Sequence, residues 1–122
     1  MEEKGFVTRR VAELLRKKGF DRKVNHYYAD EEDGLRGSLS IVNWNIVGGH
    51  YSAPAVQLAI DWLEAKGYWI VYRPLDYYIG VRVSILATDE EDVWYDVNNI
   101  TAETKYEGLN KALEYCLENL IR

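Results

Sequence analysis

Two segments of the chain share one pattern, in which a charged amphipathic stretch ends in lysine, glycine and an aromatic residue. They span residues 13–20 (ELLRKKGF) and 61–68 (DWLEAKGY), 48 positions apart. Glycine suits a helix end because it takes the left-handed conformation at no steric cost, and a preceding lysine suits the negative end of the helix dipole. Each segment then runs into apolar residues. The pattern predicts two helix–strand units, produced either by a duplication or by two independent junctions.

The length of 122 residues fits one domain covering residues 1–122. The single cysteine, Cys116, cannot form an intramolecular disulfide, and it lies in an apolar helical stripe that is typical of a core residue. No secretion signal follows Met1 and no apolar run reaches the roughly 20 residues that span a bilayer. We therefore expect a cytoplasmic protein without a membrane segment.

Three helices are predicted from apolar residues at helical spacing. The first runs from about Val7 or Thr8 to Lys18. The second opens at residues 52–54 (SAP), with Ser52 as its cap and proline in its first turn, and it ends at Gly67. The third starts at a capping box, residues 104–107 (TKYE), and runs to about Leu120.

Strands are predicted between these helices from β-branched and aromatic runs bounded by turn residues. The predicted strands cover residues 24–28, 35–42, 68–73, 77–87 and 93–97, and residues 43–51 are expected to form a loop. In residues 77–87, Ile79, Val81, Val83 and Ile85 alternate with more polar residues, which places them on the core side. The order predicts an α+β fold with two layers, in which three helices cover one face of a mixed or antiparallel sheet of four to five strands.

Several stretches resemble a family of small uncharacterised proteins that are common in genomes of gut anaerobes and in their phages or mobile elements. The matching stretches are residues 6–8 (FVT), 12–21 (AELLRKKGFD), 52–54 (SAP), 62–63 (WL) and 106–113 (YEGLNKAL). The chain departs from the family pattern at Ser52, where cysteine is frequent, and at Ala55, where threonine is usual. The resemblance implies an accessory protein of unknown role, and it carries over no site residues.

Catalytic and metal-binding patterns are missing from the sequence. His26 falls in a predicted strand, whereas His50 follows a glycine pair in the predicted loop and is the better functional candidate. The acidic runs 30–33 and 89–92 lack the spacing of a calcium loop and read as solvated turns. No phosphate-binding or dinucleotide glycine motif is present. We therefore expect no cofactor, no metal and no recognisable catalytic set.

Aromatic residues are the one unusual feature of the composition, with 4 Trp, 10 Tyr and 2 Phe. If Ile70 and Ile79 face the core, the other face of the sheet carries four binding candidates: Trp69, Tyr78, Arg82 and Trp94. Tyrosine, tryptophan and arginine are enriched at protein interfaces. The sequence thus predicts a non-enzymatic protein-interaction module that binds a partner protein or a second copy of itself.

Two other functions stay open at this point. The formal net charge of −5 disfavours nucleic acid as a partner, although the first 28 residues carry a local excess of lysine and arginine. A nucleic-acid-binding accessory protein is therefore the first alternative. An enzyme with an unrecognised site, built around His50 and a nearby carboxylate, is the second.

Overall fold

The fold is α+β, as predicted, and a computed structural model describes it for residues 5–75 and 79–121. Within these ranges the chain forms three α-helices, one short 3-10 helix and six strands. In chain order they are α1 (Arg9–Lys17), β1 (Val24–Ala29), β2 (Arg36–Val42), η1 (Trp44–Ile46), β3 (His50–Ser52), α2 (Val56–Glu64), β4 (Tyr68–Pro74), β5 (Val81–Thr88), β6 (Trp94–Ala102) and α3 (Lys105–Asn119).

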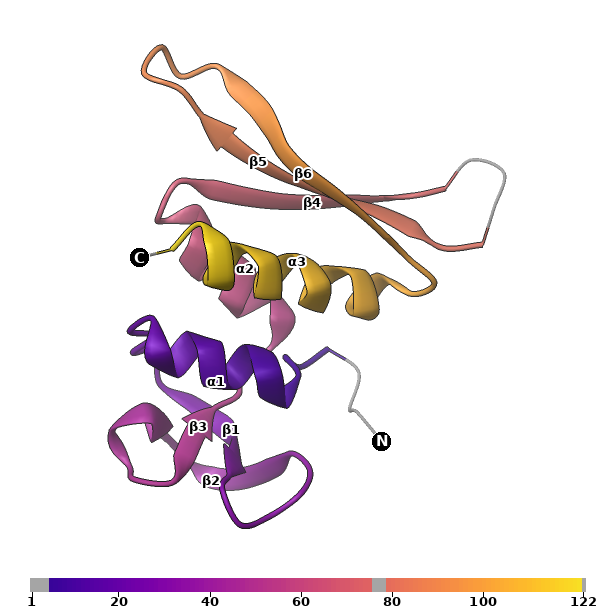
Figure 1. Cartoon of the computed structure of the whole chain (residues 1–122). Helices are drawn as coiled ribbons and strands as arrows, with labels where there is room; N and C mark the ends of the chain where they lie inside the picture. Colours follow the sequence, from indigo (N-terminus) through magenta and orange to yellow (C-terminus); the bar gives the residue numbers. More distant parts are fainter. Residues whose placement is uncertain (1–4, 76–78, 122) are drawn as a thin grey trace.

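The strands of the described residues form two antiparallel sheets, ordered β2-β1-β3 and β4-β5-β6. Figure 1 shows the sheets at opposite ends of the molecule, with the helices between them. This corrects the expectation of one sheet of four to five strands in two layers. The extra strand is β3, which pairs with β1 through Tyr28 and Tyr51 and lies in the segment that we expected to be a loop. Three residues are too few to show an alternating pattern.

Capping explains where two of the helices begin. The Thr8 hydroxyl accepts a hydrogen bond from the Val11 amide at the start of α1, and Thr104 does the same for Glu107 at the start of α3. Helix α2 has Ala55 at its cap position and no side-chain cap. The prediction that Ser52 caps this helix is therefore wrong, because Ser52 belongs to β3.

Gly19 directly follows Lys18, the C-cap of α1, as predicted, whereas α2 ends at Glu64, three residues before Gly67. Gly19 has a φ of 91° and Gly67 a φ of 97°, both in the left-handed region. Phe20, which follows the first glycine, packs edge-on against Trp62 of the second segment at 5.6 Å between ring centroids. The two helix–strand units therefore meet through their aromatic residues.

A continuous hydrophobic core joins the two sheets through the helical layer. Its largest fully buried members include Phe20 and Leu15 from the N-terminal half of the chain. Leu63, Ile85 and Leu113 contribute from the C-terminal half. Helix α1 lies against α3, and the Thr8 amide donates to the buried Asn110 side chain at 2.9 Å. This polar contact fixes the register of the two helices within an apolar layer.

Strand β5 alternates as predicted from Val81 onward, with Val83, Ile85 and Ala87 buried against the helices. Ile79 is 94% exposed, so the expectation that it faces the core is wrong. The strand begins only at Val81, and Gly80 ahead of it has a φ of 130°, which interrupts the strand geometry.

Candidate functional site

Two predicted binding residues meet on the outer face of the second sheet. Trp69 of β4 and Trp94 of β6 have ring centroids 5.0 Å apart at an angle of 67°, an edge-to-face contact. In the strand register Trp69 pairs with Leu86 of β5, and Trp94 pairs with Thr88, two residues farther along the same strand. Trp69 is 40% exposed and Trp94 is 44% exposed, so the pair packs together and still meets solvent.

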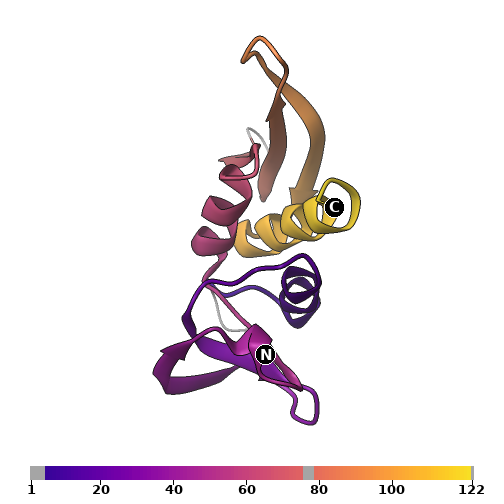
Figure 2. The ribbon, with the colours of Figure 1, turned by 90° about the vertical axis from the view of Figure 1, so that its left-hand side faces the viewer.

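Apolar residues on this side of the sheet group around the pair, and we call them the tryptophan face. It consists of Trp69, Val71, Leu86 and Trp94, which alternate with residues that point to the helices. Val71 is exposed and Leu86 is half-buried. Because helices α2 and α3 cover the opposite side of the sheet, the tryptophan face has no cover from the described part of this chain (Figure 2).

The other two predicted residues do not join the pair. Arg82 lies four residues before Leu86 on β5, a separation of about 13 Å along a strand. It pairs instead with Arg73 and Thr101 at the far end of the sheet. Tyr78 lies outside the described residues. The predicted set of four therefore reduces to a tryptophan pair and a separate arginine.

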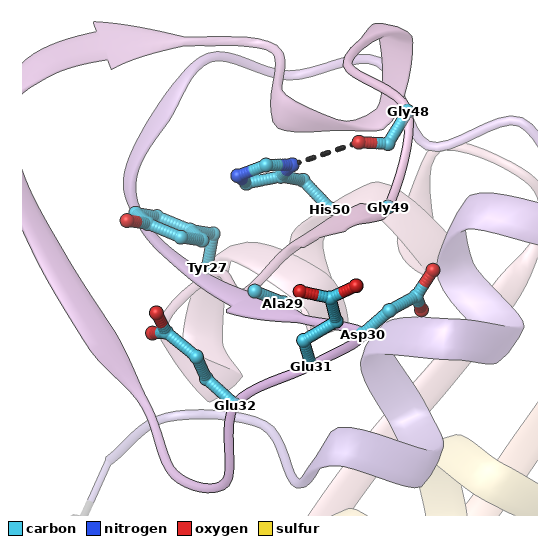
Figure 3. A pocket seen from close by; sticks show the side chains of 8 residues that line it. All are labelled: Tyr27, Ala29, Asp30, Glu31, Glu32, Gly48, Gly49 and His50. Carbon is cyan, nitrogen blue, oxygen red and sulfur yellow. Dashed lines mark hydrogen bonds between the residues drawn. The ribbon is translucent and has the colours of Figure 1, made fainter.

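A second candidate is a hollow on the outer face of the first sheet, which we call the His50 hollow (Figure 3). Tyr28 turns inward, where its hydroxyl donates to the Val7 carbonyl, so the neighbouring Tyr27 turns outward. The hollow has a volume of about 340 Å³. Its lining residues are Tyr27, Ala29, Asp30, Glu31, Glu32, Gly48, Gly49 and His50.

Three aromatic rings build one side of the His50 hollow. Tyr27 stacks on Trp44 of η1 at 4.3 Å between ring centroids, and His50 lies 5.1 Å from Tyr27 and 5.8 Å from Trp44. The Trp44 indole is anchored because its Nε1 donates to the Val24 carbonyl at 2.9 Å. The rings are therefore held by one another and by the backbone of β1.

His50 is half-buried and its orientation is fixed. Its Nδ1 lies 3.0 Å from the Gly48 carbonyl, which can only accept a hydrogen bond. In the neutral ring this contact assigns the proton to Nδ1 and leaves Nε2 as an acceptor. The guanidinium of Arg16 donates to the His50 carbonyl and so ties β3 to α1.

Three carboxylates surround the hollow, and two of them have partners. Asp30 accepts from the Tyr51 hydroxyl at 2.7 Å, and this hydrogen bond is the main reason that the pKa of Tyr51 lies above its usual value. Glu32 pairs with Arg36 at 2.7 Å. Among the described residues none pairs with the Glu31 carboxylate, and Figure 3 shows it across the hollow from the His50 ring.

The His50 hollow does not have the composition of a metal site or of a nucleophilic catalyst. In the described ranges no three His, Cys, Asp or Glu side chains lie close enough to hold a metal ion. None of the lining residues is a serine, threonine or cysteine. The hollow therefore offers ring faces, one free carboxylate and one free imidazole nitrogen. From the sequence only His50 was a candidate, because the residues that gather around it come from three separate segments.

Comparison with known proteins gives no match: no family model, no curated protein and no solved structure is similar to this chain. The resemblance to a phage-linked family therefore stays a prediction. Within residues 5–75 and 79–121, no helix is both long and apolar enough to cross a membrane.

Proposed function

We propose that the protein is a non-enzymatic interaction module that binds a partner protein, or a second copy of itself, through the tryptophan face. The observation that carries this proposal is the exposed Trp69–Trp94 pair. Large aromatic side chains that are held in place lose little conformational entropy when a partner covers them, and tryptophan is the residue most enriched at energetic centres of interfaces.

The surroundings of the pair support the same proposal. Polar residues share the face with the pair: Ser84 pairs with Val71, Asp96 pairs with Leu86, and the Ser84 hydroxyl is 2.6 Å from the Asn99 side-chain oxygen. Non-obligate protein interfaces combine apolar and polar groups in this way. An exposed apolar patch of this kind also needs a reason on a protein of 122 residues.

The nucleic-acid alternative is weakened by what the arginines of α1 do. Arg9 contacts Glu13 at 3.3 Å and Arg10 contacts Glu118 at 2.7 Å. The hydrogen bond to Glu118 is the main cause that raises the pKa of Arg10. Cations that are already paired within the chain contribute little to phosphate binding. We expect no retention of single- or double-stranded probes in a filter-binding assay at low salt.

The proposal is tested by affinity capture from the native host with two variants of the chain. In the first, Trp69→Ser and Trp94→Ser are combined. In the second, Ile46→Ser removes an exposed apolar side chain from η1, away from the tryptophan face. We expect quantitative mass spectrometry to find partners on the wild type and on I46S and to lose them on the double variant.

Light scattering measures the oligomeric state and so tests whether the partner is a second copy of the chain. A wild-type dimer that becomes a monomer in the W69S/W94S variant supports the proposal. Far-UV circular dichroism checks that the double variant keeps its secondary structure. Identical capture by all three proteins, together with an unchanged oligomeric state, rejects the tryptophan face as the binding surface.

A further inference from the structure

The His50 hollow has the features of a site for an organic cation. We propose that it binds a methylated ammonium group, through the faces of Tyr27 and His50 and the carboxylate of Glu31. This proposal is independent of the tryptophan face, which lies on the other sheet at the opposite end of the molecule (Figure 1).

The aromatic rings that line the hollow can attract a cation. Aromatic faces carry partial negative charge and attract cations within about 6 Å of the ring centre. Tyr27 presents one face to Trp44, and its remaining surface lines the hollow together with the half-buried His50 ring. Since Trp44 and the Gly48 carbonyl hold these two rings, a ligand does not have to order them.

The charges that line the hollow are negative. The lining contains three carboxylates and neither lysine nor arginine. The nearest cations are committed elsewhere: Arg16 donates to the His50 carbonyl and lies over the Tyr51 ring at 5.3 Å, and Arg36 pairs with Glu32. Arg9 donates to the Glu32 carbonyl at 2.9 Å. Glu31 is the lining carboxylate for which the described residues show no partner, and Asp30 also keeps its charge because the Tyr51 hydroxyl that it accepts from is neutral.

The geometry also distinguishes the kind of cation. A metal ion needs several converging ligands, and the described residues offer no such group. A methylated ammonium has few or no N–H groups and is recognised by ring faces and one nearby negative charge. A volume of about 340 Å³ is at the lower end for ligand pockets, which suits a head group of this size.

Choline is the first probe, and its binding is followed by NMR of the wild-type protein. We expect saturable shifts of the Tyr27 and His50 signals, with a dissociation constant on the order of millimolar. The matched control is 3,3-dimethyl-1-butanol, which has the same shape without the charge. It should bind at least about ten-fold more weakly if cation–π attraction holds the ligand.

Two single-residue variants separate the effect of the Glu31 charge in the hollow from the effect of the net charge of the protein. Glu31→Gln should weaken choline binding on the order of five-fold, because it removes the free carboxylate that lines the hollow. Asp33→Asn makes the same change of net charge two positions along the same turn, at a residue that is not part of the lining, and should change binding less than about two-fold. Both positions are exposed, so neither variant should lose the fold.

A peptide containing trimethyllysine forms the second arm, because a methylated ammonium can belong to a small molecule or to a modified protein. Tighter binding of the peptide than of choline assigns the site to a protein ligand, and the reverse assigns it to a free small molecule. The proposal is overturned if neither probe shifts Tyr27 and His50 saturably. Equal binding of the neutral analogue, or equal losses in E31Q and D33N, overturns it as well.

Discussion

At the scale of single residues, the environment decides whether a reactive group is chemically available. Cys116 is completely buried on the core side of α3, and this burial raises the pKa of its thiol to about 12. A thiol reacts as the thiolate, and the raised pKa keeps the Cys116 thiol protonated near neutral pH. Its assignment as a core residue follows from the helical stripe in the sequence.

We therefore expect Cys116 to resist thiol reagents in the native protein. At about pH 8 an ordinary free cysteine reacts readily, because part of it is ionised. Cys116 should react only after denaturation, with one thiol per chain. Titration with a chromogenic disulfide in the presence and absence of guanidinium measures this directly. Rapid reaction of the native protein would contradict the burial of the thiol.

At Gly108 helix α3 approaches β5 so closely that we expect a side chain at this position to destabilise the protein. A Cβ at this position would come within 2.8 Å of Val83 Cγ2 and 3.2 Å of Val81 Cγ2. Alanine in place of glycine normally stabilises a helix by about 1 kcal/mol. Here we expect Gly108→Ala to lower the free energy of unfolding by about 1–3 kcal/mol instead, because the core is overpacked.

Urea denaturation measures the effect of Gly108→Ala, and Val83→Ala provides the control. The smaller side chain at position 83 makes room for the new methyl group, so the double variant should lose less stability than the sum of the two single variants. Stabilisation by G108A alone would show that the helix and the strand can separate without cost.

At the scale of the elements, exposed edges and faces determine how the sheets behave. Strand β2 is an edge of the first sheet and carries Leu39, whose side chain is fully exposed, together with the exposed Ile41. Its pairing with β1 shifts in register between Val24, which pairs with Val42, and His26, which pairs with Gly37. Unpaired edges with apolar side chains tend to pair with other chains, and a bulge or a charge opposes this.

We expect Leu39→Lys to suppress aggregation without changing stability. The leucine makes almost no contact that folding could lose, so the melting temperature should stay within the error of the measurement. A lysine on the edge disfavours strand pairing between chains. Turbidity during incubation at high concentration, compared with Ser40→Thr as a nearby variant without added charge, provides the test. A large drop in melting temperature would mean that Leu39 packs within the molecule.

Local sequence patterns predicted some of the helices and strands and missed others. Helices α1 and α3 were predictable because Thr8 and Thr104 cap them and their apolar residues repeat at helical spacing. Strand β3 was not, because it has only three residues and depends on its long-range pairing with β1. The start of α2 was misplaced for the same reason, since Ser52 looks like a cap but forms the end of that strand.

Among the site residues, the part that was predictable is the part that follows from local alternation. Trp69 falls on the outer face because Ile70 is buried, and the same period of two applies in the opposite strand. The His50 hollow depends on the placement of residues from β1, the turn after it and β3, which no local pattern encodes. Arg82 shares the face with the tryptophans, but its distance from them depends on the register.

At the scale of the whole molecule, the helical layer connects the two sheets mechanically. Helix α1, next to the first sheet, packs on α3, next to the second sheet, and Phe20 packs on Trp62. The buried core runs through both units without a polar boundary. Each sheet has three strands and covers only one side of the helices, so neither unit buries its apolar residues alone.

The shared core predicts one cooperative unfolding transition for residues 1–122. Hydrogen-exchange or NMR signals of Tyr28, in the first sheet, and of Val83, in the second, should report the same midpoint in urea. Far-UV circular dichroism should coincide with both. Two separated midpoints would contradict the single domain that the length of the chain predicts.

The placement of the sheets on opposite sides of the helices has one more consequence. A ligand in the His50 hollow and a protein on the tryptophan face would sit at the two ends of the molecule, with the helical layer between them. They would not compete for space, and each could arrive first. A chain with this shape can act as a connector that brings two different molecules together while they stay out of contact with each other.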